Sequence, residues 1–290
     1  MEGYVATIGM FDGVHTGHQF VLHQVVGCAK ERGLQSLAIT FDHSPRQEQV
    51  LTPLSEKLRL IKETGIDQVE VLSFTPSLKA LTARQFMKQV LKEQLNVRVL
   101  LTGYDNRFGH NREEGFEDYV CYGQELGIEV LGLPAEGDVS SSRIRQLLTE
   151  GYIEEATECL GHPYTITGRV THGKHIGTEL GFPTANLQPD TPHQLIPATG
   201  VYAVRVFPSP LTSHPSSLYC GMMNIGTRPT FNGHHQTLEV HLFHFAQDLY
   251  NQQLMVSFVS RLREERRFDS SEALKAQLQK DALLAEELLK

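Results

Sequence analysis

Two histidines stand three residues apart in a glycine-rich segment near the start of the chain. The segment from Gly9 to His18 reads GMFDGVHTGH and also contains His15. Glycines let a backbone approach a ligand closely, and the N-terminus of the helix expected next offers N–H groups and a favourable dipole to anions. We therefore predict a polyphosphate site at which both imidazoles reach one ligand. Taken alone, the same spacing also fits a metal-binding pair or two surface histidines.

Two further segments in the first half carry polar groups. The segment VSSSRIR, from Val139 to Arg145, brings hydroxyl and guanidinium groups to the expected start of a helix. Such groups suit a triphosphate leaving group, although an N-cap serine with solvated arginines would look the same. The segment GYDNRFG, from Gly103 to Gly109, follows an expected strand and would by itself be an ordinary polar loop.

The second half has its own candidate site. The stretch GKHIGTELGFPTAN runs from Gly173 to Asn186, and its glycines suit a mobile loop over a nucleotide. The side chains of Thr184 and Asn186 offer oxygens to a hard cation, and Mg²⁺ usually takes only one or two protein ligands beside phosphates and water. For these residues alone, a turn followed by a capping asparagine is the plainer interpretation.

A later stretch, TLEVHL, alternates between polar and apolar residues. Thr237, Glu239 and His241 share one face of the strand that this alternation predicts, and the apolar residues between them share the other. A polar, solvated sheet face explains the pattern without any further role.

The first half has the rhythm of an α/β fold. Apolar, β-branched segments recur about every 30 residues with helical patterns between them, which predicts a parallel, doubly wound sheet that binds ligands beyond the carboxyl ends of its strands. The expected strands begin near Tyr4, Gln35, Asp67, Val97 and Glu129. Gly33 is expected to end the first helix, and Thr82 with Gln85 resembles a capping box that opens a later helix reaching Leu95.

After Ser140 the pattern changes. A short helix from about Arg143 and a second from Ile153 to Leu160 precede strands without intervening helices, which predicts an antiparallel barrel or sandwich. The expected strands are Tyr164–Val170, Val201–Phe207, Leu218–Met223, Thr237–Phe243 and Leu254–Val259. Asp269 with Glu272 is expected to cap a final helix. A chain of 290 residues is long enough for two domains, and we place them at residues 1–157 and 158–290.

Net charge, cysteine content and apolar runs indicate which ligands and which cellular compartment to expect. The formal net charge of −8 disfavours a polyanion, so we expect a small nucleotide ligand rather than nucleic acid. The four scattered cysteines (Cys28, Cys121, Cys159 and Cys220) form no C-x-x-C pair and are expected to be reduced. We see no signal peptide and no apolar run of about 20 residues, so the sequence predicts a cytoplasmic protein without a membrane span.

The complete strings resemble known signatures. GMFDGVHTGH is similar to the signature of the nucleotidyltransferase superfamily, in its FAD synthetase branch, and VSSSRIR and GYDNRFG resemble that family's I-S-S-T-x-I-R and G-x-D-F-x-F-G motifs. GFPTAN closely resembles the riboflavin kinase signature. Further family-like strings are Gly200–Val204, Asn224–Thr230 and Leu262–Phe268. Over nearly its whole length, the chain resembles the bacterial bifunctional riboflavin kinase/FAD synthetase family.

This resemblance implies a Rossmann-like nucleotidyltransferase domain followed by an antiparallel β-barrel riboflavin kinase domain with a C-terminal helix. It also implies that ATP, with Mg²⁺, phosphorylates riboflavin to FMN and then adenylylates FMN to FAD with release of pyrophosphate. The implied small-molecule partners are thus riboflavin, FMN and ATP, whereas the oligomeric state is not indicated.

The resemblance assigns residues as well. It implies that His15 and His18 stabilise the adenylyl-transfer transition state and that Glu239 is the general base of the kinase. The implied nucleotide- and flavin-binding residues are Gly9, Phe11, Asp12, Gly17, Asp105, Ser141, Ser142, Arg145, Gly173, Lys174, Gly181, Pro183 and Arg263. Within this set, Ser141, Ser142 and Arg145 would hold the β- and γ-phosphates, and Arg263 would contact the flavin. Thr184 and Asn186 are the implied Mg²⁺ ligands.

Some positions depart from the family's pattern. Asn106 replaces a phenylalanine, which predicts the loss of an apolar or stacking contact, and Phe41 to Pro45 reads FDHSP in place of F-x-P-H-P. Three alternatives stay open: a riboflavin kinase with a degenerate or differently specific first domain, a non-catalytic flavin- or nucleotide-binding regulator, and a metal-dependent hydrolase using His15 and His18 with Asp12 as a third ligand.

Overall fold

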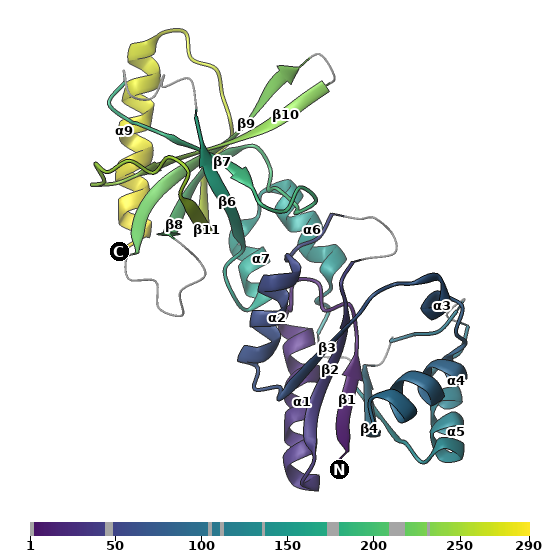
Figure 1. Ribbon diagram of the computed structural model, residues 1–290. Coiled ribbons are helices and arrows are strands. Elements are labelled where there is room, and N and C mark those ends of the chain that lie inside the picture. The colour runs from purple at the N-terminus through teal and green to yellow at the C-terminus, as the bar shows by residue number, and fades with distance from the viewer. Residues whose placement is uncertain are drawn as a thin grey trace. The chain divides into compact units, whose positions relative to one another are not determined.

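The computed structural model describes residues 3–43, 49–103, 106–110, 113–134, 137–172, 180–208, 218–230 and 233–290, without the side chains of 228–230 and 233–235. The chain forms two compact units, Met1–Ser141 and Ser142–Lys290. Figure 1 shows the elements of each unit by label. Each unit has its own core, so each is described by itself.

The described part of the first unit contains a five-stranded parallel sheet in the order β3-β2-β1-β4-β5. Its strands are β1 (Tyr4–Ile8), β2 (Gln35–Phe41), β3 (Gln68–Leu72), β4 (Val97–Gly103) and β5 (Glu129–Leu133). The chain adds strands to one side of β1 and then returns to build the other side. The strand order therefore reverses between β1 and β4, and open α/β sheets bind ligands beyond the carboxyl ends of their strands at such a point.

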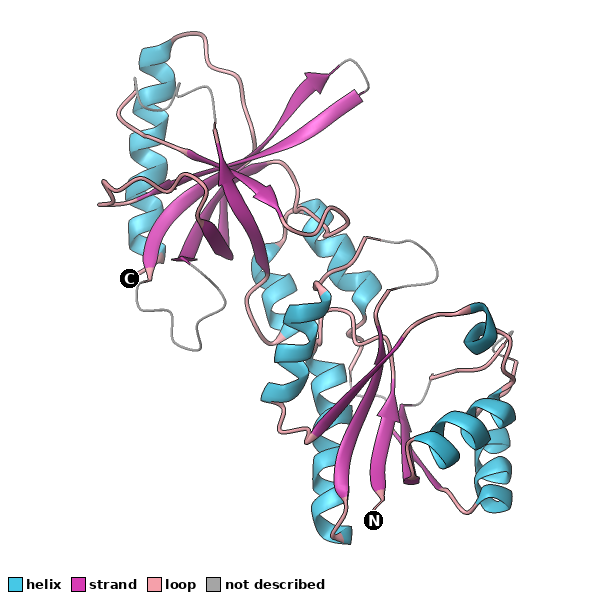
Figure 2. Ribbon diagram, viewed as in Figure 1, coloured by secondary structure: helices cyan, strands magenta, loops and turns pink. Residues whose placement is uncertain are grey.

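Helices cover both faces of this sheet, as Figure 2 shows. The helical elements are α1 (Thr16–Arg32), α2 (Leu54–Glu63), α3 (Pro76–Lys79), α4 (Ala83–Phe86), the π-helix η1 (Met87–Gln94) and α5 (Phe116–Leu126). Alternate strand residues enter the two cores: Val5 and Ala38 pack with α1 and α2, whereas Ala6 and Ile39 pack with α4, η1 and α5. The predicted doubly wound α/β architecture is confirmed.

Two helix ends of the first unit form where the sequence predicts them. Gly33 ends α1 in the left-handed conformation, with φ of 64°. Thr82 and Gln85 form both hydrogen bonds of a capping box at the start of α4. The helix predicted from there to Leu95 forms as α4 followed directly by the π-helix η1, and Leu95 is its C-cap residue.

The second unit is built around a closed antiparallel barrel in the order β10-β7-β6-β11-β8-β9. Its strands are β6 (Thr165–Thr171), β7 (Ala185–Pro189), β8 (Gly200–Pro208), β9 (Tyr219–Thr230), β10 (Gly233–Leu242) and β11 (Gln253–Arg263). Of the predicted alternatives, the structure is therefore a barrel and not a sandwich. The strand β7 was not predicted, because it is short and overlaps the polar end of the GFPTAN string.

Two helices precede the barrel and are tied to it. They are α6 (Ser141–Glu150) and α7 (Ile153–Leu160). Ala198 N donates to Leu148 O of α6 at 2.9 Å, and the guanidinium of Arg261 on β11 donates to Glu150 O at 3.4 Å. The compact units accordingly divide after Ser141, whereas the boundary near residue 158 is a division by function and stays a prediction.

The C-terminal helix α9 (Ser271–Leu288) packs on the barrel through Ala285. Its N-cap is Ser270, whose hydroxyl accepts from Ala273 N at 3.2 Å, so the prediction of Asp269 as the capping residue is wrong. A serine one residue closer to the helix has the extended backbone that lets its side chain reach the N3 amide.

Two glycines inside helices of the first unit have opposite surroundings. A Cβ at Gly27 of α1 would meet nothing within 4 Å, whereas a Cβ at Gly123 of α5 would lie 2.4 Å from Ile128 O. Gly27→Ala should raise the free energy of unfolding by about 0.5–1 kcal/mol, because alanine favours the helix. Gly123→Ala should lower it by about 1–3 kcal/mol, because backbone must move. Urea unfolding followed by circular dichroism measures both, and equal effects would contradict the close packing of α5.

Candidate active sites

The loop between β1 and α1 has a strained backbone. Phe11 and Val14 have φ of 48° and 40°, and Gly13 between them has φ of 86°. A β-branched residue in the left-handed region is rare, and such strain persists only where the surroundings fix it. Here Phe11 and Val14 are buried in the core beneath the loop, and Val14 N donates to Phe11 O at 3.1 Å. Packing thus forces the tight turn that precedes α1.

Residues just before and within α2 hold this loop in place. The Asp12 carboxylate accepts from Leu51 N at 3.0 Å and from Thr52 N at 3.1 Å. Lys57 of α2 is buried, and its ammonium donates to Met10 O at 3.1 Å and to Phe41 O at 2.8 Å. The sequence analysis did not single out Lys57, because it lies in an ordinary amphipathic helix.

His15 and His18 lie together at the N-terminus of α1, as predicted. Their rings stack with centroids 3.6 Å apart, and His18 N donates to His15 Nδ1 at 3.4 Å. His15 is therefore the N-cap of α1, and an accepting Nδ1 places the proton of a neutral His15 ring on Nε2. Gly17 is the second residue of the same helix. The arrangement offers N–H donors and a helix N-terminus to an anion.

Burial lowers the pKa of the His18 imidazole well below its ordinary value, and the neighbouring His15 and the Lys57 ammonium lower it further. Burial also lowers the pKa of Lys57, against the opposite pull of the Asp12 and Asp42 carboxylates. His18 is thus neutral at pH 7 and acts as a hydrogen-bond donor or acceptor rather than as a cation. An anion bound beside it would raise its pKa again.

Metal binding by this histidine pair finds no support in the surroundings. Across residues 3–43, 49–103 and the other described ranges, no three His, Cys, Asp or Glu side chains gather as a metal site. The Asp12 carboxylate, the third ligand that a metal-dependent hydrolase would need, accepts the two backbone N–H groups of Leu51 and Thr52.

The serine segment is divided between the units. The loop between β1 and α1, residues 9–15, is the histidine loop. The Ser141 hydroxyl donates to Asp12 O of this loop at 2.9 Å. Ser142 and Arg145 follow in α6 and belong to the second compact unit. Their phosphate-holding roles stay predictions.

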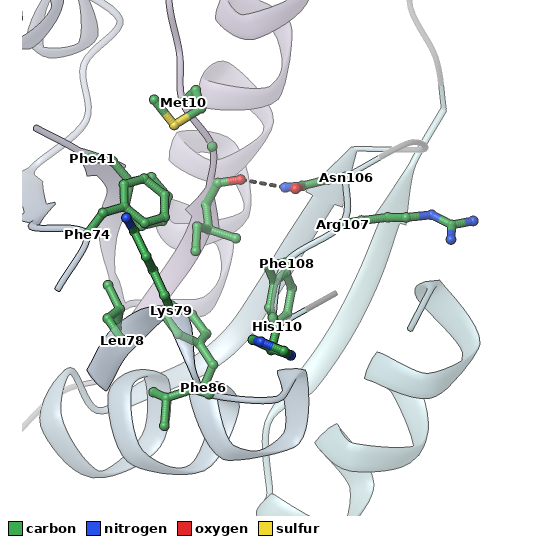
Figure 3. A pocket seen from close by; sticks show the side chains of 14 residues that line it. Met10, Phe41, Phe74, Leu78, Lys79, Phe86, Asn106, Arg107, Phe108 and His110 are labelled. Carbon is green, nitrogen blue, oxygen red and sulfur yellow. Dashed lines mark hydrogen bonds between the residues drawn. The ribbon is translucent and has the colours of Figure 1, made fainter. Parts of the chain in front are cut away.

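An apolar cavity of about 410 Å³ adjoins the histidine loop and shares Gly9 and Met10 with it. Figure 3 shows the aromatic side chains that line it, with Lys79 near Phe74 and Arg107 extending away from the other labelled side chains. The aromatic lining residues are Phe41, Phe74, Phe86 and Phe108. Phe41 and Phe74 stack with ring centroids 4.2 Å apart. A cavity of this size with aromatic walls suits a flat aromatic ligand.

Asn106 lies in the lining of this cavity. Its side-chain amide donates to Ile8 O at the end of β1, as the dashed line in Figure 3 marks. Phe108, two residues on, stacks on the buried Tyr119 at 4.2 Å, and the Tyr119 hydroxyl accepts from Phe108 N at 3.0 Å. Asn106, at the position where the family has phenylalanine, thus forms a hydrogen bond to the central strand β1. The aromatic wall at Phe108 is supported by the stacked Tyr119.

The second unit gathers its polar residues through strand register. Glu239 of β10 is paired with Asn186 of β7 on one side and with Asn224 of β9 on the other. Directly paired residues of antiparallel strands point to the same face. The predicted base and one predicted metal ligand are therefore neighbours, and Asn224 joins them. Asn224 stood in a family-like string, but only the pairing reveals its place.

The turn before β7 is anchored to the same face. His241 Nδ1 lies 2.7 Å from Pro183 O, and the rings of Phe182 and His241 meet edge-on at 5.2 Å. Thr184 lines a cavity of about 420 Å³ together with His172 and Tyr250, whose rings stack at 3.6 Å. Gly181 opens this turn with φ of 86°.

Two residues of the LREERRF string, Arg263 and Glu265, have defined neighbours in the structure. Arg263 Nε donates to the Asp281 carboxylate of α9 at 2.9 Å, so the helix fixes this guanidinium, and its contact with a flavin stays a prediction. A Cβ at Gly226 would lie 2.9 Å from Glu265 Oε1 and 3.3 Å from Asn224 Nδ2. Glycine there leaves room for the Glu265 carboxylate beside the Asn224 amide. Sequence reasoning missed Glu265.

Three predicted site residues, Asp105, Gly173 and Lys174, lie outside the described residues.

Comparisons with known proteins cover both units. Residues 1–145 match the model of a family described as FAD synthetase, and residues 160–289 match that of riboflavin kinase. The bifunctional riboflavin kinase/FMN adenylyltransferase of Escherichia coli (strain K12) is 40% identical over 297 residues, covering 99% of this chain and 93% of that protein. The protein of the same name from Haemophilus influenzae is 36% identical over 97% of this chain and 92% of its own length.

A solved structure is also similar over most of the chain. A crystal structure described as a macrolide-efflux protein from Streptococcus pneumoniae has a TM-score of 0.87 and 31% identity, covering 97% of this chain and 92% of that one. The efflux description belongs to the pneumococcal protein, whereas the family models that match this chain name two flavin-related activities.

The lowered pKa of His18 makes the first unit sensitive to acid. Below about pH 6.5, the ordinary pKa of histidine, the unfolded chain binds a proton at this position that the folded chain does not bind. The free energy of unfolding should therefore fall as pH drops through this range and be fully retained above it. His18→Gln should show a smaller fall between about pH 7.5 and 5.5 than the unchanged chain, as measured by urea unfolding.

The matched control is His23→Gln, which changes an exposed histidine on the same helix α1. If His18→Gln and the unchanged chain lost equal stability over this pH range, His18 would not be held neutral by burial.

Proposed function

Because this chain belongs to the bifunctional riboflavin kinase/FMN adenylyltransferase family, we propose that its two reactions occur at separate sites, one in each compact unit. The chain phosphorylates riboflavin to FMN and adenylylates FMN to FAD, both with ATP. The adenylyltransferase site would be the histidine loop with the aromatic cavity, and the kinase site would be the barrel face around Glu239. The observation that carries this assignment is that Gly9 and Met10 belong to both the loop and the cavity. Adenylyl transfer to a flavin needs a triphosphate site and a flavin site that meet.

At the first site, the phosphate of FMN would attack the α-phosphorus of ATP. The bond from that phosphorus to the bridging oxygen breaks, and pyrophosphate leaves. The chain's part is to align the reactants and to stabilise the charge on the α-phosphate. The imidazoles of His15 and His18 would donate N–H groups to it, together with the N-terminus of α1. Ser141, whose hydroxyl donates to Asp12 O, would help to hold the β- and γ-phosphates, which depart as pyrophosphate.

The isoalloxazine ring of FMN would occupy the aromatic cavity. Phe41 and Phe74 provide stacked walls, and Phe108 provides a wall that Tyr119 supports. The Lys79 ammonium lies 6.0 Å from the centre of the Phe74 ring, where it can meet negative charge on the ligand. The cavity thus combines apolar area for the ring with a cation for the phosphate.

At the second site, Glu239 would accept the proton of the terminal ribityl hydroxyl of riboflavin. That oxygen then attacks the γ-phosphorus of ATP, and ADP leaves. The adenine of ATP would enter the cavity beside Thr184, where the stacked His172 and Tyr250 offer an aromatic surface. A carboxylate in this role contributes about 10²–10⁴-fold to the rate.

The oxygen donors at this site fit Mg²⁺. A threonine hydroxyl and an asparagine carbonyl are hard ligands, and Mg²⁺ needs only one or two protein ligands when phosphates and water complete its shell. Thr184 and Asn186 lie two residues apart, and Asn186 is paired with Glu239. Mg²⁺ would neutralise charge on the β- and γ-phosphates.

The substrates would be small molecules in the cytoplasm rather than nucleic acid or lipid. The net charge of −8 and the absence of any disulfide among the four cysteines support this placement. None of the described helices is long and apolar enough to cross a membrane.

Two variants test the assignment of separate sites. The double change of His15→Ala and His18→Ala should lower FAD formation from FMN by at least about 10²-fold and leave FMN formation intact, because it removes donors at the α-phosphate only. Glu239→Gln should lower riboflavin phosphorylation by about 10²–10⁴-fold and leave FAD formation intact. Each rate is measured separately with purified protein.

Each variant serves as the folding control of the other unit. Loss of both activities in either variant would contradict two separate sites, and normal phosphorylation by Glu239→Gln would remove Glu239 as the base.

A further inference from the structure

One buried cation in the first unit, Lys57, lies next to the proposed adenylyltransferase site. Lys57 of α2 is 5% exposed and projects from the helix to the carboxyl ends of β1 and β2. A lysine is almost never this buried unless its ammonium is paired or hydrogen-bonded. Its burial costs free energy that a methionine of similar length would not cost. The contacts of the buried ammonium indicate what offsets this cost.

The partners of Lys57 are two backbone carbonyls of the adenylyltransferase site. Met10 O belongs to the strained loop that carries His15, and Phe41 O ends β2. Thr40 Oγ1 also donates to Met10 O, at 3.2 Å. One side chain thereby ties the loop after the central strand to the end of its neighbour.

These two carbonyls belong to residues that line the aromatic cavity. Met10 and Phe41 are both part of its wall, and Met10 is also part of the histidine loop. A shift of the ammonium would therefore move the loop that faces the triphosphate and the wall that faces the flavin at the same time. Reacting groups that are misplaced by about 1 Å can cost about 10²-fold in rate.

The charge of Lys57 acts on the same site. Its ammonium lies near enough to His18 to disfavour the imidazolium form, and His15 acts on His18 in the same direction. Burial lowers the pKa of Lys57, and the Asp12 and Asp42 carboxylates act in the opposite direction, favouring the charged form of its ammonium. A buried ammonium and a histidine whose pKa is lowered are thus electrostatically coupled at the same site.

We propose that Lys57 is a positioning residue for adenylyl transfer. Its ammonium holds the histidine loop and the flavin-facing wall in position relative to each other, and it lies near the proposed site of the triphosphate. This role rests on the proposed adenylyltransferase site, and it concerns the first unit alone.

Lys57→Met tests the role, because methionine keeps the length and apolar stem but removes the charge and the donors. The kcat/KM for FAD formation should fall by about 10²-fold, with KM raised for both FMN and ATP. The acid limb of the pH profile of kcat/KM should move to higher pH, because removing a positive charge raises the pKa of His18. Riboflavin phosphorylation by the same molecule should be unchanged.

Lys62→Met is the matched control. Lys62 lies on the same helix α2 and also donates to a backbone carbonyl, that of Asp67, but it is exposed and lies outside the site. This variant should keep wild-type kinetics for both reactions. If the unchanged protein made no FAD, the proposed function itself would fail, independently of Lys57.

A merely structural Lys57 would give a different result. Loss of FAD formation in proportion to the folded fraction, with both KM values and the pH profile unchanged, would overturn the proposal. If Lys57→Met does not fold, Lys57→Gln replaces it, because its amide still donates two N–H groups but carries no charge. A folded Lys57→Gln variant with wild-type KM values and pH profile would also overturn the proposal.

Discussion

The turn that follows β1 is the constraint on which the first unit depends. β1 is the central strand, and the order of strands reverses beside it, so any chain that leaves its carboxyl end enters the place where open α/β sheets bind ligands. The turn is so tight that Phe11 and Val14 adopt left-handed backbone conformations. Burial of both side chains supplies the free energy that maintains this conformation. The stacked histidines, the start of α1 and the wall of the aromatic cavity all follow from it.

In the second unit, strand pairing rather than backbone strain positions the polar side chains of the candidate site. The pairing of β10 with β7 and β9 aligns Asn186, Glu239 and Asn224 across neighbouring strands. Because a slip of one residue would turn Glu239 to the opposite face, the closed barrel fixes the chemistry of the face as well as its shape. The contact of His241 with Pro183 O ties the preceding turn to the same strand. The two units thus position polar side chains by different physical means.

Much of this was visible in the sequence, and the part that was not has a common cause. The strand rhythm, the capping box at Thr82 and the histidine pair are local patterns, and local patterns can be predicted. Lys57 looked like any lysine of an amphipathic helix, and Asn224 and Glu265 stood in family-like strings without a role of their own. Their places depend on pairing and packing between distant segments, which no short window of sequence contains. The short strand β7 was missed for a related reason, since its partner strands rather than its own residues define it.

One chain turns riboflavin into FMN and FMN into FAD. The most direct test follows the flavins over time by chromatography after the purified protein is mixed with riboflavin, ATP and Mg²⁺. We expect FMN to appear first and FAD to replace it while ATP remains. Accumulation of FMN without FAD in excess ATP would contradict the adenylyltransferase site, and no conversion at all would contradict both sites.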